Sequence, residues 1–347
     1  MFEIDFTFNE PFELASGEVL DEVRLRCTIY GRLNEDKTNA ILVFHALTGS
    51  SRIGDWWNGM IGENEALDTS EYAFVCVNYL GSCYGSTSAR SIKRRRRGGL
   101  PIVTAGDIVR ANALLLDRLG IPGFRAVIGG SVGGMLALRF AVDFPDLSGE
   151  VISIAAAPLS AMGLALNHIQ RHAIGRNDIG LARKIALLSY KSPRRFTERF
   201  GRNPNRNGED PYARGDDRFD VAGYLDHHGD AFRERFEIES YELITKAMDL
   251  FEVTEEDIDQ IRAKVSLIGI SSDWLFPAAD VAALCRRLEY RGVDARYYEI
   301  ESDDGHDAFL SDIEATSGVL RKILGTAEPQ RQIVRETERT PAFAGIY

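Results

Sequence analysis

The sequence has few cysteines, no long apolar run and fewer positive than negative charges, 41 lysines and arginines against 52 aspartates and glutamates. Its 347 residues include 4 cysteines, Cys27, Cys76, Cys83 and Cys285, which form neither a C-x-x-C pair nor a metal-binding spacing. Free thiols are typical of a cytoplasmic protein, so we expect that location, with no bound metal or cofactor. No run reaches the roughly 18 apolar residues that cross a membrane, and residues 1–11 lack the pattern of a signal peptide. The net charge of −11 argues against a nucleic acid as the main partner.

What the sequence has is alternation between strand and helix patterns at both ends of the chain. Apolar runs of strand type cover residues 40–46, 72–81, 126–130, 151–157 and 265–270, and an alternating strand pattern covers 22–31. Helix patterns between them cover 105–120, 135–145 and 278–292, and each ends at a glycine or a proline. Strands that are apolar on both faces suit the interior of a parallel sheet covered by helices. The order therefore predicts an α/β fold with a mostly parallel, doubly wound sheet.

The alternation stops in the middle of the chain. Over residues 159–262 the strand runs disappear and charged helical segments replace them. We expect this segment to be a helical lid inserted into an α/β core formed by residues 1–158 and 263–327. The tail, residues 328–347, is polar and has no period, which is typical of a mobile end or of one packed on a neighbour.

The stretch "AVIGGSVGGM", residues 126–135, holds a G-x-S-x-G pattern around Ser131. Such a pattern alone can be a tight turn with no chemical role. Here it follows an apolar strand and opens a helix, which is the arrangement that lifts a nucleophilic serine above the sheet in α/β-hydrolases. The context predicts an α/β-hydrolase fold with Ser131 as its nucleophile.

A serine nucleophile needs a base, and the base needs a group that orients it. In this fold the acid follows the serine along the chain and the histidine comes last. Asp273, in "SSDWLFP", follows the predicted strand 265–270. His306, in "GHDAFL", follows a further strand pattern over residues 295–301. Read separately, Asp273 could be a helix cap and His306 a surface residue, but their order and placement favour a triad with Ser131.

An acyl-transfer site also needs N–H donors for the oxyanion. One usually comes from the residue after the serine, here Val132, and one from the loop after an earlier strand, here Leu47. His45 lies in the same loop, and we expect it to shape that loop.

Six stretches together resemble one family: "FHALTGS", "DWWNGMIGENEALDT", "NYLGSCYGSTS", "GGSVGGM", "SSDWLFP" and "GHDAFL". In this order they are similar to the homoserine O-acetyltransferases, the MetX-type acyltransferases of the α/β-hydrolase superfamily. The resemblance implies a ping-pong reaction in which acetyl-CoA, as co-substrate, acylates the serine and L-homoserine then takes the acetyl group, a step of methionine biosynthesis. It also implies a homodimer formed through the lid helices.

The resemblance assigns further residues. Asp307 matches the residue that binds the ammonium of the amino acid, and Arg183 matches the lid arginine that binds its carboxylate, with Tyr190 beside it. Physical chemistry supports the second pairing, because residues seven apart share one face of a helix and a guanidinium fits a carboxylate. Without the resemblance, Arg183 would be read as a solvated charge and Asp307 as a turn residue.

The run Lys93–Arg97 consists of five consecutive basic residues in an acidic protein. A solvated loop is one interpretation. The other is a landing site for the phosphates of CoA, which would assign that role to Arg94, Arg95 and Arg96.

Shared motifs leave the substrates open. Serine as the acceptor or succinyl-CoA as the donor would need only a few changed pocket contacts, since one methylene contributes roughly 1–3 kcal/mol of discrimination. A serine esterase with the same triad is a further alternative, although a clamp for a zwitterion has no use in a simple esterase. The absence of the usual proline after "GST", where Ser88 and Ala89 stand, also bears on the substrates.

Overall fold

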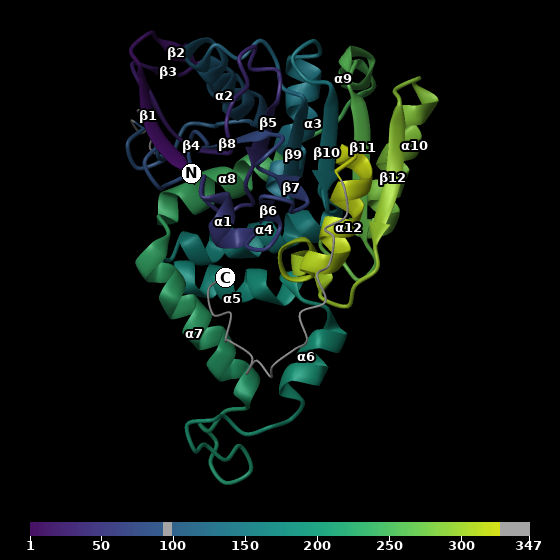
Figure 1. Cartoon of the computed structure of the whole chain (residues 1–347). Helices are drawn as coiled ribbons and strands as arrows, with labels where there is room; N and C mark the ends of the chain where they lie inside the picture. Colours follow the sequence, from purple (N-terminus) through teal and green to yellow (C-terminus); the bar gives the residue numbers. More distant parts are fainter. Residues whose placement is uncertain (93–98, 327–347) are drawn as a thin grey trace.

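An eight-stranded sheet forms the centre of the computed structural model, which describes residues 1–92 and 99–326 (Figure 1). In spatial order the strands are β1 (Phe2–Phe8), β4 (Val23–Tyr30), β8 (Ala73–Asn78), β5 (Ala40–Phe44), β9 (Ala126–Gly130), β10 (Glu150–Ile154), β11 (Lys264–Ile270) and β12 (Ala295–Ile300). Strand β4 pairs antiparallel with β1 and with β8, and every other pair in this sheet is parallel. The predicted mostly parallel sheet is confirmed.

Helices cover both faces of this sheet, and the period-2 alternation of strand side chains supplies an apolar core to each face. In β5, Leu42 and Phe44 belong to one buried cluster, and Ile41 and Val43 belong to the other. Helices α2 (Ala105–Leu119), α3 (Val132–Asp143) and α10 (Ala278–Tyr290) pack into the first cluster. Helices α1 (Ile53–Trp56), α11 (Ala308–Ser311) and α12 (Ile313–Leu324) pack into the second. Both layers exist because these strands are apolar on both sides.

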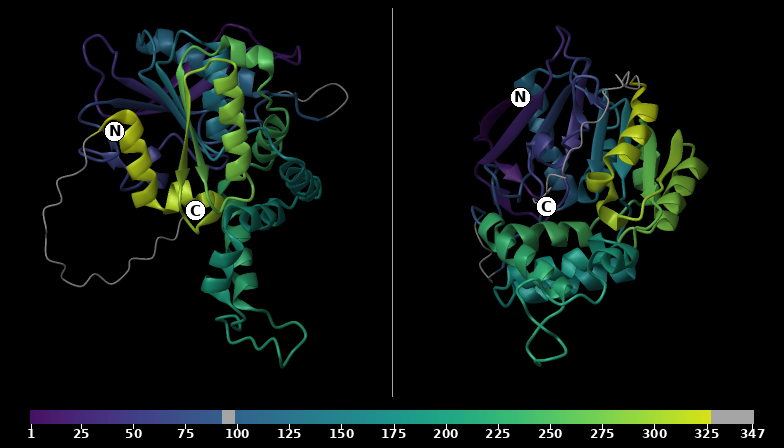
Figure 2. Two further views of the ribbon diagram at one scale, coloured as in Figure 1. Left: turned by 90° about the vertical axis from the view of Figure 1, so that its right-hand side faces the viewer. Right: turned by 60° about the horizontal axis from the view of Figure 1, so that its bottom comes forward.

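A second group of helices runs between β10 and β11. They are α4 (Ala161–Ile174), α5 (Ile179–Tyr190), α6 (Pro193–Phe200), α7 (Asp220–Arg235), α8 (Ile238–Asp249) and α9 (Glu255–Gln260). Helices α4 to α8, drawn in teal and green, lie across the end of the sheet where the parallel strands finish (Figures 1 and 2). Helix α9 lies at the opposite end, where Asp257 pairs with Arg139 of α3 at 3.1 Å. The predicted insertion therefore contains one helix that belongs spatially to the core.

Short elements complete the described chain. They are the two-residue strands β2 (Phe12–Glu13), β3 (Val19–Leu20), β6 (Ile61–Gly62) and β7 (Leu67–Asp68), and the 3-10 turn η1 (Gly305–Asp307). The predicted tail, residues 328–347, lies outside the described residues. No helix in the described part of the chain is long and apolar enough to cross a membrane.

Candidate active site

Ser131 occupies a strained turn between β9 and α3. Its backbone has φ 58° and ψ −127°, and its N–H donates to the carbonyl of Ile154 at 2.9 Å. A non-glycine residue held at positive φ costs roughly 1–3 kcal/mol and persists only where its surroundings impose it. The conformation places the Ser131 side chain beyond the end of its strand, with 5% of the residue exposed.

Glycines make this turn possible. A Cβ atom on Gly129 would lie 2.1 Å from the carbonyl oxygen of Gly133, and one on Gly133 would lie 2.2 Å from the carbonyl oxygen of Phe44. On Gly130 a Cβ would lie 2.5 Å from the ring of Phe309. All three distances are well inside van der Waals contact, so β9, α3 and β5 approach this closely only because these side chains are absent.

A chain of hydrogen bonds connects Ser131 to the two residues that the sequence selects as its partners. His306 Nε2 lies 2.9 Å from Ser131 Oγ, and His306 Nδ1 lies 2.7 Å from Asp273 Oδ2. The other carboxylate oxygen, Asp273 Oδ1, accepts the backbone N–H groups of Leu275 and Phe276, both at 2.9 Å. Asp273 follows β11 and His306 follows β12, so the neighbouring parallel strands deliver both side chains to the edge where Ser131 lies.

The electrostatics of this chain depend on its burial. His306 is 2% exposed and Asp273 is 5% exposed. Burial alone lowers the pKa of His306, but the charge and hydrogen bond of Asp273 outweigh it, so that the pKa lies above its ordinary value. The imidazole is therefore made more basic and is oriented with Nε2 towards the serine hydroxyl. This geometry can move a proton between Ser131 and His306.

The two backbone N–H groups that the sequence selects for an oxyanion are not engaged in hydrogen bonds within the described chain. Within residues 1–92 and 99–326, neither Leu47 N–H nor Val132 N–H donates a hydrogen bond. The loop of Leu47 is held by the Ala46 carbonyl, which lies 2.8 Å from His45 Nδ1 and accepts the Tyr79 hydroxyl at 3.3 Å. Burial lowers the pKa of His45 to about 4, so this ring is neutral and acts as a structural support.

Arg183 lies on α5 with its guanidinium packed between two aromatic rings. The carbon at its centre lies 5.1 Å from the Phe232 ring centroid and 5.4 Å from that of Tyr190. The Tyr190 ring is in turn 5.8 Å from the ring of His306. Arg183 is only 6% exposed, and it has no ion pair or hydrogen bond with any residue of the described chain. A buried cation without a counter-charge is costly, which indicates a site for an anionic group of a ligand.

The structure gives Asp307 a partner that the sequence did not indicate. Asp307 Oδ2 lies 3.1 Å from Lys191 Nζ, at the carboxyl end of α5. Sequence reasoning missed Lys191, although it directly follows Tyr190. The available signal was its place next to Tyr190, a residue that the resemblance assigns to the site.

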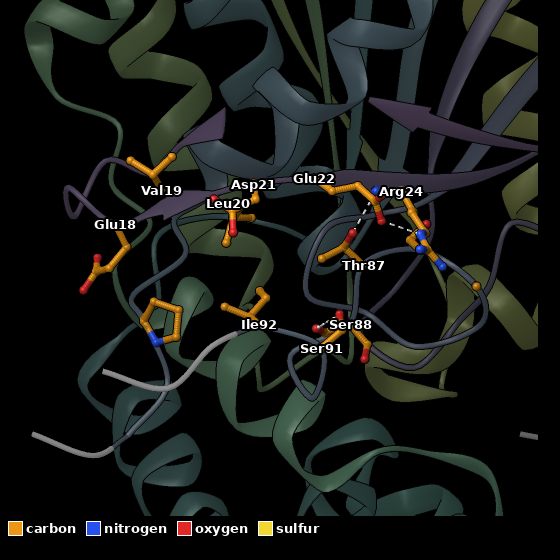
Figure 3. Close-up of a pocket in the computed structure, with 13 residues that line it drawn as sticks. Glu18, Val19, Leu20, Asp21, Glu22, Arg24, Thr87, Ser88, Ser91 and Ile92 are labelled. Atoms are coloured by element: carbon orange, nitrogen blue, oxygen red, sulfur yellow. Dashed lines mark hydrogen bonds and ion pairs between the residues drawn. The ribbon is translucent and has the colours of Figure 1, made fainter. Parts of the chain in front are cut away.

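The predicted phosphate-binding residues Arg94, Arg95 and Arg96 lie outside the described residues. A cavity of about 600 Å³ borders both ends of that gap (Figure 3). It is lined by residues 18–22, by Arg24 of β4, by residues 85–88, and by Ser91, Ile92 and Pro101, and no residue of the Ser131 site contributes to it.

The fold and the serine turn define the class of protein. Residues 39–313 match the model of the alpha/beta hydrolase fold family. The chain is 35% identical to a homoserine O-acetyltransferase of Geotalea daltonii, over 94% of this chain and 98% of that protein. It is equally identical to a homoserine O-succinyltransferase of Alkalilimnicola ehrlichii, over 90% and 92%. A crystal structure of homoserine O-acetyltransferase from Bacillus anthracis superimposes with a TM-score of 0.83 at 23% identity, over 93% and 97% of the two chains.

The family model spans residues 39–313, and the two relatives and the crystal structure each cover 90% or more of the chain. The protein is an α/β hydrolase by fold. Within that superfamily it belongs to the homoserine O-acetyltransferase family, as the six sequence stretches predicted.

Proposed function

We propose that this protein transfers an acetyl group from acetyl-CoA to the hydroxyl of L-homoserine through an acyl-enzyme on Ser131. The observation that supports the proposal most strongly is the pairing of two features in one buried site. A hydrogen-bonded Ser131–His306–Asp273 chain provides the nucleophile, and the uncompensated guanidinium of Arg183 provides a place for a carboxylate. An acceptor that carries both a hydroxyl and a carboxylate would use both.

In the first half-reaction His306 Nε2 takes the proton of Ser131 Oγ as the oxygen attacks the thioester carbonyl. The N–H groups of Leu47 and Val132 bind the oxyanion of the tetrahedral intermediate. Its collapse breaks the C–S bond, His306 returns the proton to the departing thiolate, and free CoA leaves an acetyl ester on Ser131. Asp273 holds the imidazole in the required tautomer and stabilises the imidazolium.

In the second half-reaction homoserine replaces CoA. Arg183 binds its carboxylate with Tyr190 beside it, and Asp307 binds its ammonium, which brings the hydroxyl to the acyl-enzyme. His306 removes the hydroxyl proton, the oxygen attacks the acetyl carbonyl, and the proton returns to Ser131 as O-acetylhomoserine forms. Ser131, His306 and Asp273 are almost fully buried under helices α4 to α8. This burial limits the access of water to the acyl-enzyme and so favours transfer to the acceptor over hydrolysis.

The same chemistry would accept other partners. A succinyl donor is supported by the relative named as a homoserine O-succinyltransferase, which is as similar in sequence as the one named for acetyl transfer. Serine as acceptor would need the same clamp one methylene closer to the acyl group. We prefer the acetyl donor and homoserine because several of the similar relatives are named as homoserine O-acetyltransferases.

Apolar side chains on the lid support a homodimer. Met162 and Ile169 of α4 and Leu181 and Leu188 of α5 are 43% to 58% exposed, which is unusual for large apolar residues. The described helices α4 and α5 also pack against each other, so these exposed side chains belong to neighbouring helices that could together contact a second copy of the chain. The four cysteines are buried and free, which supports a reducing compartment such as the cytoplasm.

A thiol-release assay tests the proposed function. Acetyl-CoA and succinyl-CoA are each offered with homoserine and with serine, to the wild type and to Ser131→Ala. We expect acetyl-CoA with homoserine to turn over fastest and Ser131→Ala to lose at least about 1,000-fold in kcat. Full turnover by Ser131→Ala would remove Ser131 as the nucleophile. Hydrolysis of a p-nitrophenyl ester that no amino acid stimulates, without thiol release in any pair, would favour the esterase.

A further inference from the structure

Lys191 is fixed against the loop that carries the base. Its carbonyl accepts the indole N–H of Trp274 at 3.3 Å. Gly305, with φ +73°, has no room for a Cβ, which would lie 2.9 Å from Lys191 Cα and 2.6 Å from Ser192 N. The Ser192 hydroxyl donates to the carbonyl of Asp303. The carboxyl end of α5 is therefore docked directly on the residues around His306.

The side chain of Lys191 forms an ion pair with one of the two carboxylate oxygens of Asp307. Its ammonium lies 3.1 Å from Oδ2, and the two side chains are 23% and 18% exposed. The other oxygen, Oδ1, accepts no hydrogen bond within the described parts of the chain. A carboxylate anchored through one oxygen has a defined orientation for the second, so a further cation can bind Oδ1 without displacing Lys191.

Lys191 also faces the base. The groups around His306 are the carboxylates of Asp273 and Asp307, the ammonium of Lys191, the hydroxyl of Ser131, and the rings of Tyr190, Phe276 and Phe309. Lys191 is the cation among them, and it partly offsets the two carboxylates. Within the described chain, Lys191 therefore contacts Asp307 and also reduces the effect of the two carboxylates on the pKa of His306.

We propose that Lys191 is a positioning residue that orients Asp307 for the ammonium of the acceptor. The proposal rests on the proposed function and adds a specificity-determining residue to it. Lys191 directly follows α5, the helix that carries Arg183. The groups proposed to bind the two ends of the amino acid are therefore positioned by α5 and by its contact with the histidine loop. An acceptor without an ammonium does not use this contact.

The test compares Lys191→Met, Lys191→Arg and the control Lys184→Met. Lys184 lies on α5, the helix that Lys191 follows, and its side chain has a similar exposure, but it pairs with Asp226 of α7, away from the histidine loop. For Lys191→Met we expect the KM for homoserine to rise about 5- to 10-fold, which is the effect of a lost charge-assisted contact. The KM for 4-hydroxybutanoate, which lacks the ammonium, and the rate of acylation by p-nitrophenyl acetate at pH 8.5 stay within about twofold.

A pH profile separates positioning from a merely structural role. Removal of a cation that faces His306 raises the pKa of the base, so the acid limb of kcat/KM moves to higher pH in Lys191→Met. In Lys191→Arg we expect the KM for homoserine and the acid limb of kcat/KM to return to their wild-type values. Lys184→Met changes neither of them. An unchanged or lower KM for homoserine in Lys191→Met, or an equal loss with 4-hydroxybutanoate, would overturn the proposal. Failure of the proposed function is distinct, because the wild type itself would then release no thiol on addition of homoserine.

Discussion

Asp273→Asn is the substitution whose consequence follows most directly from the site geometry. Asp273 Oδ1 accepts two backbone N–H groups, so the oxygen of an asparagine must take that position. Its NH₂ group then faces His306 Nδ1, where the carboxylate oxygen lay at 2.7 Å. A donor opposite Nδ1 forces the proton onto Nε2. The imidazole then donates to Ser131 and cannot accept its proton.

The expected loss is large although no atom moves. A triad with the wrong histidine tautomer loses about 10⁴-fold in kcat, which corresponds to about 5.5 kcal/mol of transition-state stabilisation. Both half-reactions use His306, so we expect them to fall together. The KM values stay close to those of the wild type, because Asp273 does not contact either proposed substrate.

The assay is thiol release from acetyl-CoA, with stopped-flow acylation by p-nitrophenyl acetate as the measure of the first half-reaction. Asp107→Asn is the matched control, since Asp107 is equally buried and also accepts a backbone N–H, from Ala15 at 2.8 Å, but contacts no histidine. We expect it to retain activity. An Asp273→Asn enzyme with more than about a tenth of wild-type kcat would refute the assigned role of the carboxylate.

Four further outcomes are expected. Arg183→Met raises the KM for homoserine about 100-fold and leaves the KM for acetyl-CoA unchanged in steady-state kinetics, because only the acceptor has an α-carboxylate. Gly133→Ala, whose Cβ would lie 2.2 Å from a backbone oxygen, loses at least about 1–3 kcal/mol of unfolding free energy in denaturant titration. Because His306 acts as a base only when neutral and its pKa is raised, kcat/KM falls with an acid midpoint above pH 6.5, and a midpoint below 6 contradicts the pairing with the carboxylate. Reversing Arg94 and Arg95 to glutamate raises the KM for acetyl-CoA with kcat nearly intact, and an unchanged KM would retire that site.

Several features of this fold could be predicted because they depend on local pattern. The runs that became β5, β9, β10 and β11 are apolar on both faces, and only the interior of a covered parallel sheet satisfies such strands. The glycines around Ser131 predict, from the sequence alone, that strand and helix approach closely at this turn, and the structure shows that approach. The position of α9 could not be predicted in this way, because its six residues resemble the charged helices before it, and only its contact with α3 shows that it lies at the other end of the sheet.

In the candidate site, too, some features could be predicted from the sequence and others depend on tertiary contacts. The residue types, their order along the chain and their positions after strands were sufficient to select Ser131, Asp273 and His306, because parallel strands bring their carboxyl ends to one edge. The partner of Asp307 and the isolation of the Arg183 guanidinium were decided by the docking of α5 on the histidine loop, and such long-range contacts leave no periodic trace in the sequence. Local order therefore determined which side chains this protein could use, and tertiary packing alone decided which charges remain uncompensated.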